Sequence, residues 1–381
     1  MKFETAKLID FASFSQGLQV PIQHQFTEYA DDRKRFIRIV DITSGGNEPP
    51  RYIVDPGERY FVNESDLFMI RYGSPQVAKG WEGVIANNLF KIKLNSNNLD
   101  TNWLYYYLKQ DWVNQYLLGI SVSATMPAIS FKAFGALKVI HPPLPTQSKI
   151  ASILTAYDDL IENNLKRIKL LEEKAFLRYK QIVREEKMDE FLIEEVCETL
   201  GGGTPATGDR RFWDEGDILW FSPTDLTKHH SIVLLNSEKK ITELGLQKSS
   251  AKLVPPKTIL MTSRASIGYF GLINKSASTN QGFINIIPFN ENHRAYMLFD
   301  LKNRKEEIIG NANGSTFLEI SKGKFRQMKM KLPKDEKILE DFEREFEINF
   351  NFIENLLKQN NKLREARDIL LPKLMNGQIE V

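Results

Sequence analysis

Residues 144–182 read LPTQSKIASILTAYDDLIENNLKRIKLLEEKAFLRYKQI, and this stretch decides how the chain is organised. Its apolar side chains recur every seven residues in two rows, Leu154, Ile161, Ile168, Ala175 and Ile182 in one, and Ile150, Tyr157, Asn164 and Leu171 in the other. A repeat of this kind is typical of a helix that pairs with another helix. A helix from about residue 147 to 187 would be roughly 60 Å long, because each residue adds 1.5 Å.

A second helix of the same kind is predicted near the end of the chain. Its rows are Phe342, Asn349, Leu356, Leu363 and Leu370 in one, and Phe346, Ile353, Asn360, Arg367 and Leu374 in the other. Pro372 and Gly377 are expected to end this helix. Neither helix can bury its apolar stripe alone, so we expect the two to pair as an antiparallel coiled coil. Asn164, Asn349 and Asn360 would then fix the register. The alternative is that each stripe packs only on its own globular domain. The residues that we expect to form the coiled coil are Leu154, Ile161, Asn164, Ile168, Phe346, Ile353, Leu356, Asn360 and Leu363.

The two halves of the chain resemble each other. Ile129-Ser130 matches Ile320-Ser321 at an offset of 191 residues, and each pair precedes a basic segment that ends in Leu-Pro and leads into one of the long helices. A period this long indicates duplication of a two-part unit rather than a solenoid. We therefore predict an α+β protein with two mixed α/β domains in tandem, related by a pseudo-two-fold, at residues 1–145 and 191–335, and with long helices at 146–190 and 336–381.

Within the domains, apolar and alternating runs predict strands at 35–40, 67–71, 90–94, 218–221, 258–262 and 283–288. Residues 103–118 and 294–309 have the periodicity of amphipathic helices. The net charge is +2, distributed as +1 over 1–145, 0 over 146–190, +4 over 191–335 and −3 over 336–381. If the chain binds nucleic acid, the two domains should contact its phosphates.

Composition and motifs exclude several classes of protein. No run of 18 apolar residues predicts a membrane span, the start does not resemble a secretory signal, and the one cysteine, Cys197, rules out a disulfide framework. We expect a cytoplasmic protein without a metal, since the adjacent His229 and His230 have no carboxylate at ligand spacing. No phosphate-binding loop with Lys-Ser or Lys-Thr occurs, and Gly201-Gly202-Gly203 is interpreted as a tight turn. His141-Pro142-Pro143-Leu144 has the wrong flanks for a methyltransferase loop and is interpreted as a rigid helix entry.

Three groups of residues together resemble a known family. They are Leu200-Gly201-Gly202-Gly203-Thr204-Pro205 with Phe212-Trp213, Gly216-Asp217-Ile218, Trp220 and Asp225-Leu226; Pro142 to Gln147 leading into Ile150 to Leu154; and Leu363-Arg364 with Leu370 to Ile379. In this order they are similar to the specificity subunits of type I restriction-modification systems. The first domain lacks the Gly-Gly-Thr-Pro opening, and Phe14-Ser15-Gln16-Gly17 stands in its place. The second helix follows Leu332-Pro333 without a full Pro-Pro-Leu.

The resemblance implies a non-catalytic subunit that reads a split DNA target, one half-site per domain, with the helices as a spacer. It implies as partners double-stranded DNA, two methyltransferase subunits and the restriction subunits. S-adenosylmethionine and ATP would be bound only by those partner subunits, so no cofactor is expected on this chain. The competing hypothesis is a coiled-coil scaffold whose α/β domains bind proteins.

DNA contacts require basic and hydrogen-bonding side chains on loops that reach phosphates and base edges. Such side chains gather in 41–45, 71–74 and 87–88 of the first domain and in 222–225, 262–266, 278–282 and the basic segment 321–334 of the second. The candidate DNA-binding residues are Thr43, Ser44, Arg71, Tyr72, Ser74, Lys79, Asn88, Ser222, Thr224, Arg264, Ser266, Asn280, Gln281 and Lys324. The competing interpretation of the polar loops is that their side chains only cap turns. A strand with one solvated face would also explain the basic segment.

Overall fold

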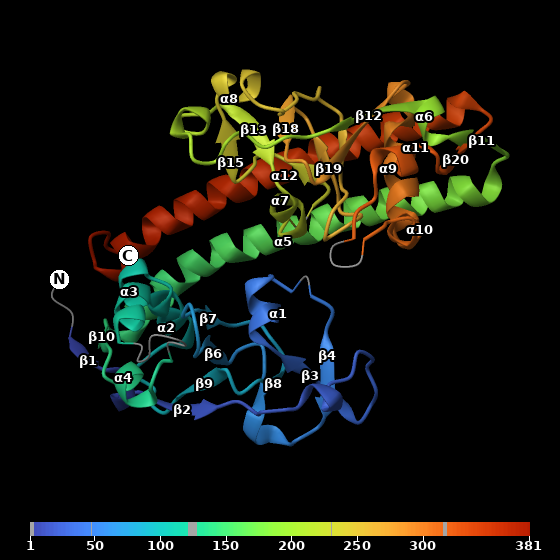
Figure 1. Ribbon diagram of the computed structural model, residues 1–381. Coiled ribbons are helices and arrows are strands. Elements are labelled where there is room, and N and C mark those ends of the chain that lie inside the picture. Colours follow the sequence, from blue (N-terminus) through green and yellow to red (C-terminus); the bar gives the residue numbers. More distant parts are fainter. Residues whose placement is uncertain (1–3, 47, 121–127, 230, 315–317) are drawn as a thin grey trace. The chain divides into compact units, whose positions relative to one another are not determined.

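The computed structural model describes residues 4–46, 48–120, 128–229, 231–314 and 318–381. The chain divides into two compact units, Met1–Ile161 with Lys362–Val381, and Glu162–Asn361. Each unit holds one α/β domain and a part of each of the two long helices, α5 (Leu144–Glu185) and α12 (Glu336–Met375), drawn in green and red in Figure 1. Among the described residues, no helix is long and apolar enough to cross a membrane.

The first domain contains two four-stranded sheets, with strand orders β2-β9-β6-β7 and β4-β3-β8-β5, and the antiparallel pair β1-β10. Its strands are β1 (Thr5–Lys7), β2 (Ala12–Gln16), β3 (Arg33–Ile37), β4 (Arg51–Val54), β5 (Phe61–Val62), β6 (Leu67–Ile70), β7 (Val77–Ala78), β8 (Gly83–Ile85), β9 (Leu89–Leu94) and β10 (Lys138–Ile140). Its helices are α1 (Ile39–Thr43), α2 (Thr101–Leu108), α3 (Asp111–Gly119) and α4 (Phe131–Gly135), with short 3-10 turns η1 (Leu8–Asp10), η2 (Ile22–His24) and η3 (Glu58–Tyr60).

The second domain contains a five-stranded sheet, β12-β19-β16-β17-β14, a three-stranded sheet, β15-β13-β18, and the antiparallel pair β11-β20. Its strands are β11 (Met188–Leu192), β12 (Cys197–Gly201), β13 (Ile218–Phe221), β14 (Val233–Leu234), β15 (Lys239–Ile241), β16 (Ile259–Thr262), β17 (Phe270–Ile273), β18 (Ala277–Thr279), β19 (Phe283–Pro288) and β20 (Lys329–Pro333). Its helices are α6 (Ile193–Val196), α7 (Pro223–Thr227), α8 (Glu243–Gln247), α9 (Arg294–Asn303), α10 (Lys305–Gly310) and α11 (Lys322–Arg326), with 3-10 turns η4 (Arg210–Phe212) and η5 (Glu291–His293).

The two domains repeat one topology. Strand β3 pairs antiparallel with β4 and parallel with β8, and β13 pairs in the same way with β15 and β18. The run β2-β9-β6-β7 corresponds to β12-β19-β16-β17. The outer pair β1-β10 corresponds to β11-β20. The predicted tandem duplication, with a long helix after each mixed α/β domain, is therefore confirmed.

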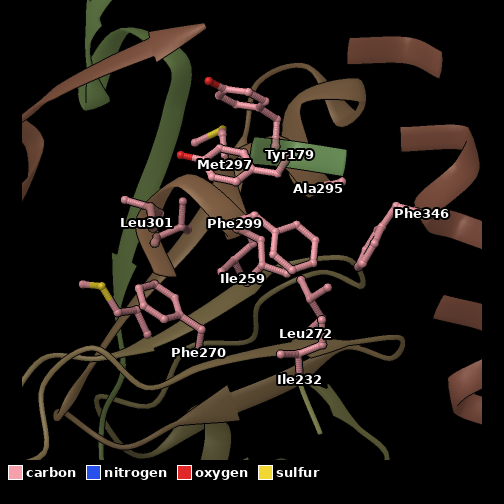
Figure 2. Packing of buried hydrophobic residues seen from close by; sticks show 14 of the residues in the cluster. Tyr179, Ile232, Ile259, Phe270, Leu272, Ala295, Met297, Phe299, Leu301 and Phe346 are labelled. Carbon is pink, nitrogen blue, oxygen red and sulfur yellow. The ribbon is translucent and has the colours of Figure 1, made fainter. Parts of the chain in front are cut away.

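The core of the second unit joins its sheet to both long helices. Figure 2 shows Phe299 of α9 between Ile259 and Leu272 of the sheet and Phe346 of α12, and all four side chains are almost fully buried. Tyr179 of α5 belongs to the same cluster, and its hydroxyl donates to Asp300 Oδ1 at 3.0 Å. The apolar stripe of each long helix thus packs on this domain and not only on the other helix.

In the second unit, α5 and α12 run in opposite directions. Asn164 Nδ2 donates to Asn360 Oδ1 at 2.9 Å, and Arg178 lies 3.7 Å from Glu345. From the first contact to the second, the residue numbers rise along α5 and fall along α12, so the two helices are antiparallel. One predicted position is wrong. Phe350 is 1 % exposed, whereas Asn349 is only half-buried, because the apolar stripe of α12 passes through the neighbouring residue.

In the first unit, the start of α5 packs with the end of α12. Ile150 and Leu154 share a buried cluster with Leu371, Leu374 and Met375, together with α2 and α3 residues of the domain. Polar contacts join the same elements, since Asp158 of α5 forms an ion pair with Arg367 of α12 and accepts a hydrogen bond from the hydroxyl of Tyr106 in α2.

Several predicted boundaries need correction. The strand predicted at 35–40 ends at Ile37, and α1 follows it. The helices predicted at 103–118 and 294–309 are each split in two, by a break at residues 109–110 and by Arg304. Strand β11 begins at 188, inside the segment assigned to the first long helix, and pairs with β20 of the second domain.

Candidate nucleic-acid interface

Backbone hydrogen bonds bring three polar segments together in the second domain. The amide of Asn280, just after β18, donates to the carbonyl of Phe221 at the end of β13, at 2.9 Å. The amide of Ser263, just after β16, donates to the carbonyl of Gly282 at 2.8 Å. The carboxyl ends of the parallel strands β13 and β18, and the end of β16, therefore meet at one edge. We call segments 222–224, 263–266 and 280–282 the second polar edge.

The first domain repeats these bonds at equivalent positions. The amide of Ala86, after β8, donates to Ile37 at the end of β3, and the amide of Arg71, after β6, donates to Asn88, both at 2.9 Å. Segments 38–44, 71–74 and 86–88 form the first polar edge. The matching bonds make Arg38 the counterpart of Ser222, and Arg71 the counterpart of Ser263. In α/β sheets, ligands commonly bind outside the carboxyl ends of such strands.

The first polar edge includes most of the predicted residues of its domain. Arg71 donates from Nε to the carbonyl of Ile129, and its guanidinium lies 5.4 Å from the ring centre of Tyr72. Thr43 and Asn88 line a pocket of about 560 Å³ at this edge. Ser44 follows Thr43, and Ser74 is exposed in the segment after Arg71. Lys79 is different, because its ammonium donates to Asn102 of α2.

The second polar edge gathers the remaining predicted residues except one. Gln281 accepts a hydrogen bond from the hydroxyl of Thr204, which ties the Gly-Gly-Gly-Thr-Pro segment to this edge. Arg264 pairs with Glu319 at 2.7 Å, and its side chain is nearly half exposed. Asn280 Oδ1 accepts from the Gly282 amide, so part of its polar capacity shapes the turn. Ser266 is exposed near Arg264, and Ser222 and Thr224 lie at the start of α7. Lys324 lies on α11 and is exposed there.

Two segments predicted as loops contain short helices. Thr43 is the last residue of α1 and Ser44 its C-cap, while Ser222 is the N-cap of α7, which contains Thr224. A carboxylate holds each helix start. The Ser222 amide and hydroxyl both donate to Asp225 Oδ2 at 2.7 Å. Asp225 therefore fixes the orientation of Ser222 at the edge.

The interpretation of Gly201-Gly202-Gly203 as a tight turn is wrong. Gly201 ends β12, and Gly202 passes against the end of β18, where a Cβ would lie 2.2 Å from the carbonyl oxygens of Thr279 and Asn280. Gly17 has the same place in the first domain, since a Cβ there would lie 2.2 Å from the Ala86 oxygen. The first domain therefore keeps one glycine of the motif, at the position where two backbone segments come into contact.

Two residues are absent from the predicted DNA-binding set: Arg38, which lies on the first polar edge, and Thr204, which was named only as part of the family motif and binds Gln281 of the second edge. Arg38 is the N-cap of α1, and it donates to Asp41 from its amide at 2.7 Å, from Nε at 2.9 Å and from Nη2 at 2.8 Å. The sequence did contain a signal for Arg38, because Arg38 precedes Asp41 by the same spacing as Ser222 precedes Asp225. Only the serine pair, however, has the composition of a usual capping motif.

Metal ligands do not gather in the described parts of the chain, where no three His, Cys, Asp or Glu side chains are placed to share an ion. Of the two adjacent histidines, His229 contacts the carbonyl of Ser231 through Nδ1 at 3.0 Å. His230 lies outside the described residues. Burial raises the pKa of the Cys197 thiol to about 12, so this group stays protonated at neutral pH.

Comparisons with solved structures address the fold. The chain is similar to the crystal structure of the type I restriction-modification system S subunit from M. genitalium, with a TM-score of 0.57 and 15 % sequence identity. The alignment covers 98 % of this chain and 96 % of that one. The likeness therefore extends over both domains and both long helices.

Comparisons of sequence address the family. The chain is 34 % identical over 181 residues to the MjaIX specificity subunit of Methanocaldococcus jannaschii, a match that covers 45 % of this chain and 40 % of that protein. It is 23 % identical to the HindI specificity subunit of Haemophilus influenzae, over 78 % of this chain and 81 % of the relative. The model of the type I restriction modification DNA specificity domain matches twice, at residues 3–173 and 185–359, so the chain belongs to the type I restriction-modification specificity family.

Proposed function

We propose that this chain is the DNA-reading subunit of a type I restriction-modification complex and that each domain reads one half of a split target. The observation that supports this most is the presence of two equivalent polar edges in one chain, built from the same strand ends and the same backbone hydrogen bonds. A protein with two such edges can contact two separate stretches of a DNA duplex.

The residues of the polar edges have the chemistry that DNA reading requires. Base edges are read by Arg, Asn, Gln, Ser and Thr side chains, while Lys, Arg, hydroxyl groups and backbone amides bind phosphates. The first edge presents Arg71, Thr43 and Asn88, and the second presents Arg264, Gln281 and Ser222. The different side chains on the two edges would give the two half-sites different sequences.

The chain would contribute recognition and no chemistry. Methyltransferase subunits that dock on it would carry S-adenosylmethionine and modify a base in each half-site, and restriction subunits would carry ATP. The paired helices α5 and α12 would set the distance between the half-sites. Such a complex would act in the cytoplasm, where it meets the genome and entering DNA.

The test is to co-express the chain with a methyltransferase subunit of a type I system from the same genome and to map methylated bases across the host genome. We expect a split motif with one modified base in each half, and its loss when this chain is deleted. Methylation that persists unchanged without the chain would remove it from the modification complex. The scaffold hypothesis, in which the domains bind proteins, would then be preferred.

A further inference from the structure

We propose, on the basis of the function proposed above, that Arg38 is a base-reading residue that recognises guanine in the half-site bound by the first domain. Arg38 lies on the first polar edge, at the carboxyl end of β3, beside the pocket that Thr43 and Asn88 also line. It therefore stands among the side chains that we expect to face DNA.

A buried carboxylate fixes the direction of the Arg38 guanidinium. Asp41 is 0 % exposed, and both of its carboxylate oxygens are used to bind Arg38. The Arg38 side chain is 21 % exposed. An arginine anchored along one side by a carboxylate loses little conformational entropy when it binds a second planar group with its free end.

The free end of Arg38 matches the major-groove edge of guanine. Nε and one hydrogen of Nη2 are directed to Asp41, and Nη2 also donates to the exposed carbonyl of Pro49 at 3.0 Å. Within the described residues, Nη1 makes no hydrogen bond. Nη1, together with the Nη2 hydrogen released from Pro49, can donate to O6 and N7 of guanine, which is the commonest specific contact between arginine and DNA.

A residue that lines the same pocket has a hydrogen-bond acceptor without a donor. Asn88 Oδ1 is buried and has no hydrogen-bond partner among the described residues. Buried polar atoms without a partner are rare in folded proteins. An incoming hydrogen-bond donor, such as the cytosine amine opposite a guanine, could satisfy it after a small side-chain movement.

The second domain cannot read guanine in this way at the equivalent position. Its counterpart of Arg38 is Ser222, whose hydroxyl is directed to Asp225. The inferred contact is therefore a difference between the two half-sites. It also suggests a matched variant, because Arg38→Ser places the residue of the second domain at the same position, beside the equivalent aspartate.

The experiment compares the chain with its Arg38→Ser, Arg38→Lys and Arg59→Ser variants, each co-expressed with the methyltransferase subunit, by mapping genomic methylation. Arg59 is exposed and stacks on Tyr60 in η3, so its replacement removes one charge from the same domain. Thermal unfolding checks that each variant folds. With Arg38→Ser we expect one guanine of the first half-site to become degenerate and the second half-site to stay unchanged. Arg38→Lys should have the same effect as Arg38→Ser, because lysine lacks the planar guanidinium group. Arg59→Ser should leave the motif intact.

Binding to synthetic duplexes with each of the four bases at that position measures the size of the effect. We expect the wild type to prefer guanine over the other bases by a factor of about 5 to 150, and Arg38→Ser to have almost no preference. An unchanged motif, or an equal loss of affinity for all four duplexes, would show that Arg38 does not read a base. A wild-type chain that directs no split motif would instead refute the proposed function itself, and this inference with it.

Discussion

Asn164 of α5 donates a hydrogen bond to the side-chain oxygen of Asn360 in α12, and both side chains are buried. A polar pair in an apolar helix interface costs stability but favours one register, because any shift would separate the two amides. This contact therefore favours the observed alignment of the two helices within the second unit.

Replacement of one partner should be more harmful than replacement of both. In Asn360→Leu the buried Asn164 amide loses its acceptor, and we expect the free energy of unfolding to fall by about 1–3 kcal/mol. The double variant with Asn164→Leu should recover most of that loss. Urea unfolding of the three proteins checks this, and a double variant that is weaker than the single one would contradict it.

The contact between Gly202 and the end of β18 should not tolerate a side chain. We expect Gly202→Ala to lower the free energy of unfolding by about 1–3 kcal/mol, because its Cβ would overlap the Thr279 and Asn280 oxygens. Gly208→Ala is the matched control, since a Cβ there meets nothing within 4 Å. Thermal unfolding of both variants is the measurement, and equal effects would disprove the role of the close approach.

Asp300 should make stability depend on pH. Burial raises its pKa in the folded chain, partly offset by Arg304 and by the hydrogen bond from Tyr179. A carboxyl group with a raised folded pKa stabilises the fold fully below its unfolded pKa of about 3.9 and loses that contribution as pH rises through the folded value.

We therefore expect the wild type to lose stability as pH is raised from about 4 toward neutrality, and the Asp300→Asn variant to lose less over the same range. Urea unfolding at a series of pH values measures the difference between the two proteins. A wild type that gains stability relative to the variant over this range would contradict the assigned direction of the pKa shift.

Longer helices should widen the gap in the target. One heptad inserted at the junction 161–162 of α5 and another at 361–362 of α12 fall between the two compact units and leave the contacts within each unit intact. Each insertion adds about 10 Å of helix. That length corresponds to about three base pairs at 3.4 Å per base pair along each strand.

Methylation mapping should show a longer gap with both half-sites unaltered. Insertion into α5 alone is the control, since it leaves seven residues without a matching partner segment and should impair the protein. Half-sites that change while the gap stays constant would exclude the spacer role of the helices.

The strength of each local signal explains how much of the fold the sequence predicted. The strand 218–221 was predicted without error because the apolar run Ile-Leu-Trp-Phe is bounded by Gly-Asp and Ser-Pro. The long helices were predicted from sustained heptads. Helices α1 and α7 were missed because five residues contain too little periodicity, and because Arg38 is not a usual cap.

The candidate site was predictable only in part. Loops rich in Asn, Ser and Arg identified segments of both edges, but not which segments meet. The need for glycine at Gly17 comes from the carbonyl of Ala86, which is distant in the sequence. A local pattern cannot show such a contact, and this is why Gly17 looked like a departure from the motif.

The bonds that join the strand ends of each polar edge run between main-chain atoms. Amides and carbonyls are common to almost every residue, so the scaffold of the edge persists whichever side chains it carries. Arg38 of the first domain and Ser222 of the second already differ at one such position, and each binds the equivalent aspartate of its own domain. Preference for a new target can thus arise when a few side chains are exchanged on an unchanged backbone scaffold. A library that randomises these positions alone should still yield folded proteins that recognise many different target sequences.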